Sequence, residues 1–392
     1  MPKLADVAEI NPRFDRSQLN DLSEMVSFVP MANVSEVLGA VTSEQARELG
    51  EVIKGFTPFK DRDVLVAKIT PCFENGKIAH ARIGRQLGFG STEFHVIRPI
   101  ATKLDDRYLY HFLRQPSVRE EGGRRMTGSG GQKRVPKTFI EALDIPLPSL
   151  TEQRRIAATL DKADALRAKR REAIAKLDQL LKSVFLEMFG DPVTNPKGWP
   201  GNTTLGDIAL DMQYGPRFHN EAYSLNGIKI VRITDLSPTG ELDFDAMPRM
   251  DVEENVQARF VLQPGDIIFA RTGATVGKVA LIRASDPPSI AGAYFIRVQV
   301  NNSVLPEYVF AALRTKSIQK FIAVKSRQAA QQNFSGPGLR KLPMPVPSLE
   351  LQCQFASLAK KIEQQRRTLQ EHVELQDAFF ASLQHRAFNG EL

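Results

Sequence analysis

Hydrophobic residues recur at alternating steps of four and three positions in two long stretches of the chain. This spacing is typical of a helix whose apolar seam pairs with another helix, whereas a lone surface helix carries a wider apolar stripe. The seam of the first stretch consists of Ile156, Leu160, Ala163, Arg167, Arg170, Ile174, Leu177, Leu181, Val184 and Met188. The seam of the second stretch consists of Phe355, Ala359, Ile362, Arg366, Leu369, Val373, Gln376, Phe380, Leu383 and Ala387. We therefore predict two long helices that form a coiled coil.

The two stretches are copies of one another. Each follows a proline-rich run, at 145–150 or at 344–349, and each ends in a phenylalanine shortly before a glycine. They align without a gap at a separation of 199 positions, as Gln153 and Gln352 do. With roughly 37–39 residues and a rise of 1.5 Å per residue, each helix would span about 55–58 Å.

Two arrangements of these helices are open. Their matched phase and length favour antiparallel pairing with each other, which would set two globular units at opposite ends. The alternative is that each helix packs only on its own globular unit. Arg167 and Arg366 lie on the seam, where a buried guanidinium needs a carboxylate partner unless it belongs to a partner-binding face. Pro148, Thr151 and Glu152 mark the start of the first helix.

Short runs rich in β-branched and aromatic residues precede each helix and predict strands. The predicted strands are 27–34, 64–69 and 94–98 in the first half, and 228–233, 267–270 and 294–300 in the second. Convincing helical spacing within these regions is confined to 108–114 and 308–314. The two regions match each other as well, for example 63–68 with 266–271. A period of this length indicates tandem domains instead of a solenoid.

The predicted fold class is α+β. Two mixed α/β domains are separated by two long antiparallel helices in a coiled coil, with an internal pseudo-twofold repeat. The predicted limits are 1–145 for the first domain, 146–190 for the central helix, 191–200 for a linker, 201–343 for the second domain and 344–392 for the C-terminal helix. Glycines and prolines between the halves indicate where the first helix ends and the linker begins.

Composition limits the class of partner. The 392 residues carry a net charge of +7 and are 42% hydrophobic. No apolar run approaches the ~20 residues of a membrane span, and the first residues lack the apolar core of a secretory signal. Cys72 and Cys353 form no metal-ligand spacing, so we expect free, buried thiols in a reducing cytoplasm. The basic balance favours a polyanionic partner, with nucleic acid ahead of a membrane.

A basic, glycine-rich loop is predicted late in each half, at 119–134 and at 325–335. Lysine and arginine bind phosphates or guanine, glutamine and asparagine pair with adenine, and glycine allows close approach. The alternative is a solvated surface loop, but the same position in both repeats favours contact with DNA. A rod of the predicted length is enough to hold two such modules about one turn of B-DNA apart, roughly 34 Å. The predicted DNA-binding residues are Lys77, Arg124, Arg125, Gln132, Lys133 and Arg134 in the first half, and Tyr214, Arg217, Arg271, Lys278, Arg327, Gln331, Gln332 and Asn333 in the second.

The sequence offers no catalytic centre. Segment 271–279 is similar to a phosphate-binding loop, but it is one residue short, and valine follows Lys278 where a metal-binding hydroxyl is needed. Its counterpart at 76–77 lacks the first glycine, so we predict turns between strands at both places. Segment 286–289 is similar to the catalytic tetrapeptide of amino-methyltransferases, but Ser289 replaces the aromatic residue that stacks on the flipped base.

Several segments together form a more specific signature. They are 145–156, 189–192, 195–199, 205–208 and 263–267. With them, the whole chain resembles the specificity (S) subunits of type I restriction-modification systems. One departure concerns the second half's Tyr214-Gly215, which follows the family pattern, whereas the first half has Asn11-Pro12-Arg13. We therefore expect that loop of the first half to contact DNA differently.

The resemblance implies two target-recognition domains, each of which recognises one half of a bipartite site in double-stranded DNA. The helices would set the half-site spacing and dock two methyltransferase (M) subunits. Those subunits would carry S-adenosylmethionine and modify adenine, so this non-catalytic chain would bind no cofactor or metal itself. A restriction (R) motor-nuclease subunit can join such a complex. The seam residues expected to govern spacing and assembly are Ile156, Leu160, Ile174, Leu177, Leu181, Phe355, Ile362, Leu369, Val373 and Phe380.

Two other functions remain open at this stage. A protein-interaction scaffold with twin domains would show no salt-dependent DNA binding, in contrast to the steep dependence expected of a DNA reader. A stand-alone nuclease or methyltransferase with a degenerate site would alter DNA unaided when given magnesium or cofactor, which the missing motifs argue against.

Overall fold

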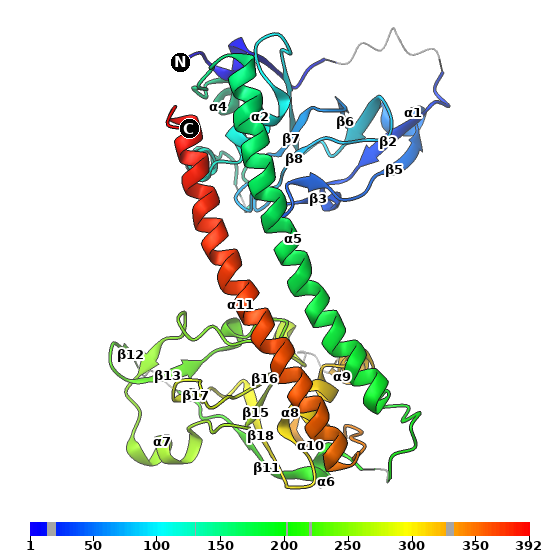
Figure 1. Ribbon diagram of the computed structural model, residues 1–392, viewed down its shortest axis with the longest axis vertical. Coiled ribbons are helices and arrows are strands. Elements are labelled where there is room, and N and C mark those ends of the chain that lie inside the picture. The colour runs from blue at the N-terminus through cyan, green and yellow to red at the C-terminus, as the bar shows by residue number, and fades with distance from the viewer. Residues whose placement is uncertain (14–20, 130, 201–202, 219–221, 327–332) are drawn as a thin grey trace. The chain divides into compact units, whose positions relative to one another are not determined.

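The computed structural model shows two compact units, each made of one globular part and one half of each long helix (Figure 1). Unit 1 comprises Met1–Glu172 and Glu371–Leu392, and unit 2 comprises Ala173–Gln370. The helices are α5 (Leu150–Phe189) and α11 (Leu349–Phe388). Because each helix belongs to both units, the units cross the domain limits predicted from the sequence. The residues that the structure describes are 1–13, 21–129, 131–200, 203–218, 222–326 and 333–392.

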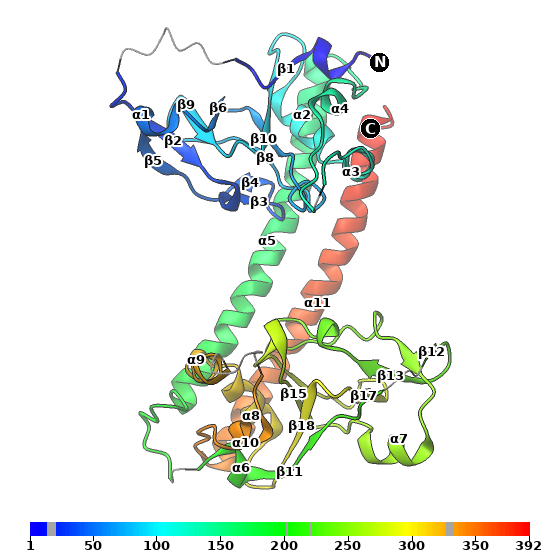
Figure 2. The same ribbon diagram turned by 180° about the vertical axis from the view of Figure 1, so that it is seen from behind.

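The globular part of unit 1 contains two sheets. Their strand orders are β1-β10-β7-β8-β4-β3 and β5-β2-β9-β6. The strands are β1 (Ala8–Ile10), β2 (Met25–Val29), β3 (Val34–Ser35), β4 (Ala40–Val41), β5 (Gln45–Glu48), β6 (Thr57–Lys60), β7 (Val64–Ala67), β8 (Ile78–His80), β9 (Leu87–Gly90) and β10 (Phe94–Pro99). The helices are η1 (Leu4–Asp6), η3 (Met31–Asn33), α1 (Leu49–Val52), α2 (Asp106–Leu113), α3 (Pro116–Arg124) and α4 (Lys137–Glu141). Helix α3 lies beside the last turns of α11 (Figure 2).

The globular part of unit 2 also contains two sheets. Their strand orders are β11-β18-β15-β16 and β12-β14-β13-β17. The strands are β11 (Ala209–Tyr214), β12 (Tyr223–Ser224), β13 (Ile228–Val231), β14 (Arg249–Met250), β15 (Ile267–Ala270), β16 (Val279–Leu281), β17 (Ser289–Ala291) and β18 (Phe295–Val300). The helices are α6 (Leu205–Ile208), η4 (Ile233–Asp235), α7 (Glu254–Phe260), η5 (Gly273–Thr275), α8 (Pro306–Leu313), α9 (Lys316–Ser326) and α10 (Gly336–Arg340).

Unit 2 repeats the strand connections of unit 1. The central strand β7 pairs antiparallel with β10 and β8, as β15 pairs with β18 and β16. The second sheet holds a parallel pair in each unit, β2 with β9 and β13 with β17. Every residue of β7 and β15 is buried, which explains why these strands are continuously apolar and do not alternate. The α+β class and the internal repeat are thereby confirmed.

All six predicted strands are present, with shifts at their ends. The largest correction concerns 27–34, because β2 ends at Val29 and Pro30 leads into the turn η3. Proline has no backbone N–H and fixes its own φ, so it favours this exit from the ladder. The prediction also placed only one helix in each globular part, whereas α3 and α9 follow those helices directly.

Both long helices have 40 residues, slightly more than predicted. Each begins after a serine that lies one position before it. The Ser149 Oγ accepts a hydrogen bond from the Glu152 N–H at 3.3 Å, and the Ser348 Oγ accepts one from the Leu351 N–H at 3.4 Å. Serine is a favoured residue at a helix N-terminus because its hydroxyl satisfies a free N–H. Helix α5 therefore begins at Leu150, within the stretch from Pro148 to Glu152 that the sequence marked as its start.

Within each unit the two helix halves run antiparallel. In unit 1, Arg155 near the start of α5 donates to the Leu392 carbonyl at 3.0 Å, and Arg167 contacts Asp377 at 2.6 Å. In unit 2, the rings of Phe185 and Phe355 lie 5.5 Å apart. Antiparallel pairing is confirmed, and the alternative of two helices packed only on their own globular units is wrong.

The C-terminal end of α11 packs on the globular part of unit 1, and the C-terminal end of α5 packs on that of unit 2. The Phe388 ring of α11 lies 5.0 Å from Tyr108 of unit 1, and the Phe189 ring of α5 lies 4.9 Å from Tyr308 of unit 2. The seam residues supply this burial. Ile156, Leu160, Phe355, Val373 and Phe380 are buried, and Ile174, Leu177, Leu181, Ile362 and Leu369 are half-buried.

A buried glutamine connects each helix to its globular part. The Gln153 Oε1 accepts from the Asp105 N–H at 2.9 Å, and its Nε2 donates to the Lys103 and Pro148 carbonyls at 3.0 and 2.9 Å. Gln352 makes the corresponding contacts in unit 2, accepting from the Leu305 N–H at 2.7 Å. A buried amide with all these partners fixes the helix start against the loop before α2 or α8.

The segment predicted as a linker is folded onto the end of α5. The Trp199 indole N–H donates to the Phe189 carbonyl at 2.7 Å, and Asn195 exchanges two 3.0 Å hydrogen bonds with the backbone of Trp199. Gly190 adopts φ +78°, the left-handed conformation that commonly ends a helix. The indole and the glycine together explain why the helix stops here.

The cysteines are free, and one prediction about them is wrong. Cys72 is half-buried, but Cys353 is exposed on α11 instead of buried. Its position falls outside the helix seam, where burial would require the partner helix. In the part of the chain that the structure describes, no helix is both long and apolar enough to span a bilayer.

Candidate nucleic-acid interface

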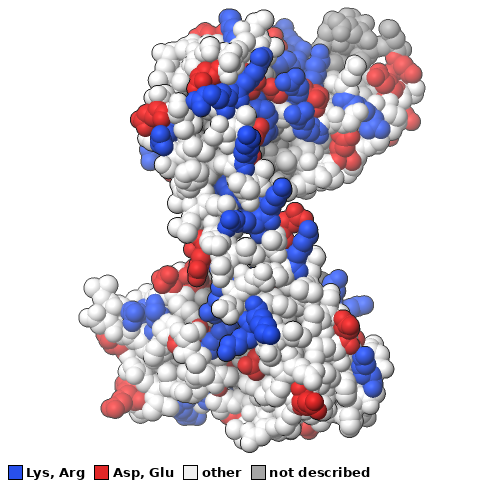
Figure 3. Space-filling view, in the orientation of Figure 1, with Lys and Arg blue, Asp and Glu red and all other residues white. Residues whose placement is uncertain are grey.

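Lysine and arginine side chains gather in clusters on the visible face of each unit, interspersed with acidic ones (Figure 3). Many of the predicted DNA contacts turn out to have intramolecular partners. Lys77 in the turn before β8 donates to the Met31 carbonyl at 3.4 Å and lies 3.7 Å from the Glu36 carboxylate. Lys278, its counterpart before β16, donates to the Leu236 carbonyl at 3.2 Å. Both lysines thus tie a strand turn to the neighbouring hairpin.

The predicted loop 119–134 begins inside helix α3, which corrects its description as a loop. Pro116 occupies the first turn of α3, and the buried Gly122 lies against the Phe73 ring, where a Cβ would come within 2.5 Å. Arg124 and Arg125 end this helix and both lie near Glu121, at 3.8 and 2.6 Å. Their side chains are exposed, so they remain available to a polyanion.

After α3, the segment continues in an extended conformation that pairs with neighbouring backbone around Arg134. Arg134 pairs with Thr127 and Ile69, and the Thr70 N–H donates to the Lys133 carbonyl at 2.9 Å. The Arg134 guanidinium donates to Glu93 at 2.8 and 2.9 Å. These hydrogen bonds are the main reason why the pKa of Glu93 is lowered.

Gln132 and Lys133 differ from Arg134 in that their side chains are exposed and make no hydrogen bond or ion pair with another described residue. Gly131 beside them adopts φ +76°.

Three predicted residues meet in unit 2. The Arg271 guanidinium lies 4.8 Å from the centre of the Tyr214 ring, and the backbone of Asn333 pairs with Thr272 next to Arg271. The Tyr214 hydroxyl accepts from the Gly336 N–H at 2.7 Å. The Arg271 Nε is shielded from solvent and has no hydrogen-bond partner among the described residues. Arg217 is exposed three positions after Tyr214, and Arg327, Gln331 and Gln332 lie outside the described residues.

The two basic segments return to the same place in the two units. In unit 1 the Val135 N–H donates to the Lys68 carbonyl at 2.8 Å, directly after β7. In unit 2 the Phe334 N–H donates to the Arg271 carbonyl at 2.8 Å, directly after β15. Each segment therefore lies at the end of the central strand of its unit. The two segments, which match in sequence, thus occupy equivalent positions in the fold.

Unit 1 has no aromatic residue like Tyr214 after β1, where the exposed Asn11 hydrogen-bonds to β10 instead. Asn11 adopts φ +54°, and its Oδ1 accepts from the Val96 N–H at 2.9 Å. Its Nδ2 lies 3.2 Å from the His95 Nδ1, while the His95 Nε2 lies 2.9 Å from the Val135 carbonyl. Burial is the main cause of the lowered pKa of His95. Asn11 thus holds the sheet together where Tyr214 presents a ring.

The arginines on the helix seam have carboxylate partners, as burial requires. Arg167 contacts Asp164 at 2.7 Å and Asp377 at 2.6 Å. Its counterpart Arg366 contacts Glu363 at 2.9 Å and also pairs with Glu241. Burial opposes the charge of Arg366, but the hydrogen bonds to Glu241 and Glu363 prevail and raise its pKa. Both arginines are evident from the helix seam in the sequence, whereas their acidic partners are not.

A second polar cluster that the sequence did not reveal surrounds His111 of α2. The buried His111 Nε2 lies 2.6 Å from the Asp161 carboxylate of α5, which Arg107 also contacts. Burial opposes ionisation of Asp161, but the hydrogen bonds from His111 and Arg107 lower its pKa to about 2. The cluster joins α2 to α5. Among the described residues, no group of three or more potential ligands is placed to hold a metal ion.

Comparison with known proteins identifies the repeated unit. The model of the type I restriction modification DNA specificity domain matches residues 1–176 and again 197–375. The EcoEI specificity subunit of a type I restriction enzyme from Escherichia coli is 41% identical over 160 residues, which cover 41% of this chain and 26% of that protein. The MjaVIII specificity subunit of Methanocaldococcus jannaschii is 24% identical over 279 residues, which cover 66% of this chain and 64% of that protein. The chain thus aligns with about a quarter of the EcoEI subunit's length.

Two solved chains share the fold. One comes from work on complex assembly and conformational transition of the type I R-M system; it is 18% identical, with a TM-score of 0.56 and coverage of 100% of this chain and 97% of that chain. The other is the type I restriction-modification S subunit from M. genitalium, 15% identical, with a TM-score of 0.54 and coverage of 98% and 95%. The matched regions take in both globular parts and most of both helices. This chain therefore belongs to the type I restriction-modification DNA specificity family and contains the family's domain twice.

Proposed function

We propose that this chain is the DNA sequence-specificity subunit of a type I restriction-modification complex. Each globular part recognises one half of a bipartite site in double-stranded DNA. The observation that carries the proposal is the match of the specificity domain to both halves, which share the same strand connections. A protein that holds two related readers is suited to a target with two separate halves.

The candidate contacts support recognition at the end of the central strand of each unit. In unit 2 the Arg271 guanidinium and the Tyr214 ring lie together beside the Asn333 backbone. In unit 1 the exposed Gln132 and Lys133 occupy the corresponding place. These residue types hydrogen-bond to base edges and phosphates, and an aromatic ring can contact a base or a sugar.

The two helices set the half-site spacing and dock two methyltransferase subunits. Their antiparallel halves are held by buried aromatic residues and paired arginines in each unit, which makes them rigid spacers. The chain itself is non-catalytic, so S-adenosylmethionine belongs to the methyltransferase subunits, and a motor-nuclease subunit can join for restriction. The complex acts in the cytoplasm, where bacterial and archaeal DNA is found.

The decisive experiment is co-expression of this chain with the methyltransferase of its own system, followed by mapping of methylated adenines with long-read sequencing. We expect a bipartite motif. Exchange of residues 201–343 for another recognition domain should change one half of the motif and leave the other half unchanged. The control is the same chain with a methyltransferase that cannot bind S-adenosylmethionine. A complex that assembles but methylates no motif would contradict the proposal.

The second candidate is a non-catalytic scaffold whose twin domains bind other proteins. It is favoured by the number of predicted DNA contacts that already have intramolecular partners, such as Lys77 and Arg134. The two candidates differ in salt dependence. A protein that binds DNA releases counterions from the phosphates, and the free energy gained by this release falls as the salt concentration rises. DNA affinity of the assembled complex measured over a salt series separates them.

A further inference from the structure

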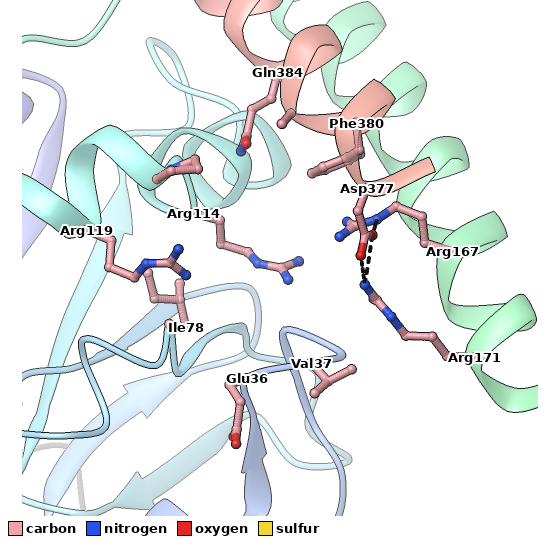
Figure 4. A pocket seen from close by; sticks show the side chains of 13 residues that line it. Glu36, Val37, Ile78, Arg114, Arg119, Arg167, Arg171, Asp377, Phe380 and Gln384 are labelled. Atoms are coloured by element: carbon pink, nitrogen blue, oxygen red, sulfur yellow. Dashed lines mark hydrogen bonds and ion pairs between the residues drawn. The ribbon is translucent and has the colours of Figure 1, made fainter. Parts of the chain in front are cut away.

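Unit 1 contains an arginine-lined cavity of about 380 Å³ between its globular part and the helices. Arg114 and Arg119 extend into it from one side, and Arg167 and Arg171 extend into it from the other (Figure 4). Four guanidinium groups face only two lining carboxylates, those of Glu36 and Asp377. None of these side chains belongs to the set of predicted DNA contacts.

Most of these cations have a partner within unit 1. Asp377 accepts from Arg167 at 2.6 Å and from Arg171 at 2.7 Å, so one carboxylate serves two guanidiniums. Asp164 contacts Arg114 at 2.9 Å and Arg167 at 2.7 Å.

Arg119 is the exception. It is half-buried, lies over the turn at Gly76, and its guanidinium makes no hydrogen bond or ion pair with any described residue. The other lining carboxylate, Glu36, lies 3.7 Å from the Lys77 ammonium. A recess with excess positive charge and a free guanidinium is suited to an anionic group.

Unit 2 shows what fills the corresponding place. There the hairpin formed by Leu236 and Leu242 carries Glu241, whose carboxylate pairs with Arg366, the counterpart of Arg167. In unit 1 the matching hairpin pairs Val34 with Val41 and Ser35 with Ala40.

The strand pairing therefore places Ala40 where unit 2 has Glu241. The Ser237 N–H donates to the Glu241 carbonyl at 2.9 Å, which is the pairing that Ser35 and Ala40 make in unit 1. Unit 1 thus has the counterpart arginine, Arg167, but has Ala40 at the position of Glu241. The carboxylate that its hairpin does carry, Glu36, lies beside Lys77.

We propose that this cavity binds an acidic side chain of a partner protein, the methyltransferase subunit that docks on unit 1. The inference rests on the proposed function for the identity of the partner. The glutamate of unit 2 is an intramolecular example of the ligand, a carboxylate carried by a polypeptide. Helices α5 and α11 supply Arg167, Arg171 and Asp377, so the site lies on the surface assigned to docking.

A DNA phosphate fits the observations less well. The cavity is recessed, and a side chain on a loop can enter it more easily than the backbone of a stiff duplex. Its lining includes the carboxylates of Glu36 and Asp377, which repel a strand that carries a charge at every nucleotide. A carboxylate that enters singly meets Arg119 with less repulsion.

The test compares two variants of the full chain that act in different ways. Arg119→Glu reverses the charge of the unpaired guanidinium. Ala40→Glu places a carboxylate at the position that Glu241 occupies in unit 2. The matched control is Lys54→Glu, because Lys54 is an exposed cation of unit 1 away from the cavity. Affinity for the purified methyltransferase subunit is measured by isothermal titration calorimetry, and affinity of the assembled complex for its methylated motif by gel shift. Circular dichroism and melting curves verify folding.

We expect both cavity variants to weaken methyltransferase binding by at least about tenfold, with Lys54→Glu unchanged. Lysine substitution of acidic residues on the methyltransferase should yield one variant that restores binding to Arg119→Glu. Unchanged methyltransferase affinity in both folded variants would overturn the inference, and so would a loss confined to DNA affinity, which would identify a phosphate site. Failure of the unmodified chain to direct methylation would instead refute the proposed function.

Discussion

Units 1 and 2 are alike where the long helices meet the globular parts and different where we place the DNA contacts. Gln153 and Gln352 make the same three kinds of hydrogen bond, and Tyr108 and Tyr308 donate to the Pro146 and Pro345 carbonyls at 3.0 and 2.6 Å. These residues hold the frame. The repeat therefore preserves the junction that sets geometry.

The differences concern the surface at the edge of the sheet. Tyr214 presents a ring beside Arg271 in unit 2, whereas the exposed Asn11 of unit 1 accepts a hydrogen bond from β10. Similarly, the hairpin carboxylate of Glu241 has no counterpart at Ala40. Two copies of one fold can thus recognise different partners because a few exposed positions change while the buried contacts remain. We therefore expect substitutions at the junctions between helices and globular parts to lower stability. Substitutions on the exposed surface should affect recognition of one half-site.

The largest effect is expected from the aromatic residues that end the helices. Phe388→Ala should destabilise unit 1 and Phe189→Ala unit 2, each by about 3–5 kcal/mol, because truncation of a buried phenylalanine leaves a cavity. Hydrogen exchange read by mass spectrometry will show which unit loosens. Phe379→Ala is the control, since that ring is 62% exposed. Faster exchange in unit 2 for Phe388→Ala, or in unit 1 for Phe189→Ala, would contradict the comparison.

The next effect concerns the buried glutamines. Gln153→Ala and Gln352→Ala each remove an acceptor from a backbone N–H and a donor from carbonyls, at a cost of about 1–3 kcal/mol for each group left unsatisfied. Urea unfolding measures the loss, with exposed Gln365→Ala as the reference. Similar losses are expected in both units. A loss in one unit alone would show that the junctions are not equivalent.

A smaller, one-sided effect is expected at the surface of unit 2. Arg271→Ala should weaken DNA binding by the assembled complex by about 1–3 kcal/mol and relax recognition of one half-site only. Methylation mapping over a randomised site reports both halves at once. Arg249→Ala serves as the control because Arg249 is exposed in the second sheet of unit 2. Equal relaxation of both half-sites would argue against separate readers.

The smallest effect is a pH dependence confined to unit 1. His95 is buried, its Nε2 faces a carbonyl that can only accept, and its pKa lies below the ordinary value of 6.5, chiefly because of burial. A lowered folded-state pKa means that the unfolded chain binds the proton more readily. This contribution to stability is therefore complete above pH 6.5 and is lost as pH falls through the folded-state pKa.

The test of that dependence is the unfolding free energy between pH 7.5 and about 5. We expect it to fall toward acid in the unmodified chain and to fall less in His95→Gln, with exposed His372→Gln behaving as the unmodified chain does. An identical slope in His95→Gln would show that other groups carry the acid sensitivity.

The sequence predicted the helices, the strands and the repeat because these follow from local periodicity and from comparison of the chain with itself. The position of the seam was predictable because residues spaced alternately by four and three positions lie on one side of a helix. The buried strands β7 and β15 were predictable because a short apolar run that is rich in β-branched residues and bounded by turn residues indicates a strand. The family signature was also legible, since it consists of contiguous segments.

The tertiary structure alone decided which residues meet. Nothing in the sequence pairs Arg167 with Asp377, or Arg366 with Glu241, because these contacts join elements separated by more than a hundred positions. For the same reason, the sequence does not distinguish an arginine with an internal carboxylate partner from one without. The fold shows that Arg134 is paired with Glu93, whereas Arg119 lines an open cavity. Periodicity specifies the face of each element, whereas the packing of elements specifies the partners of each charge.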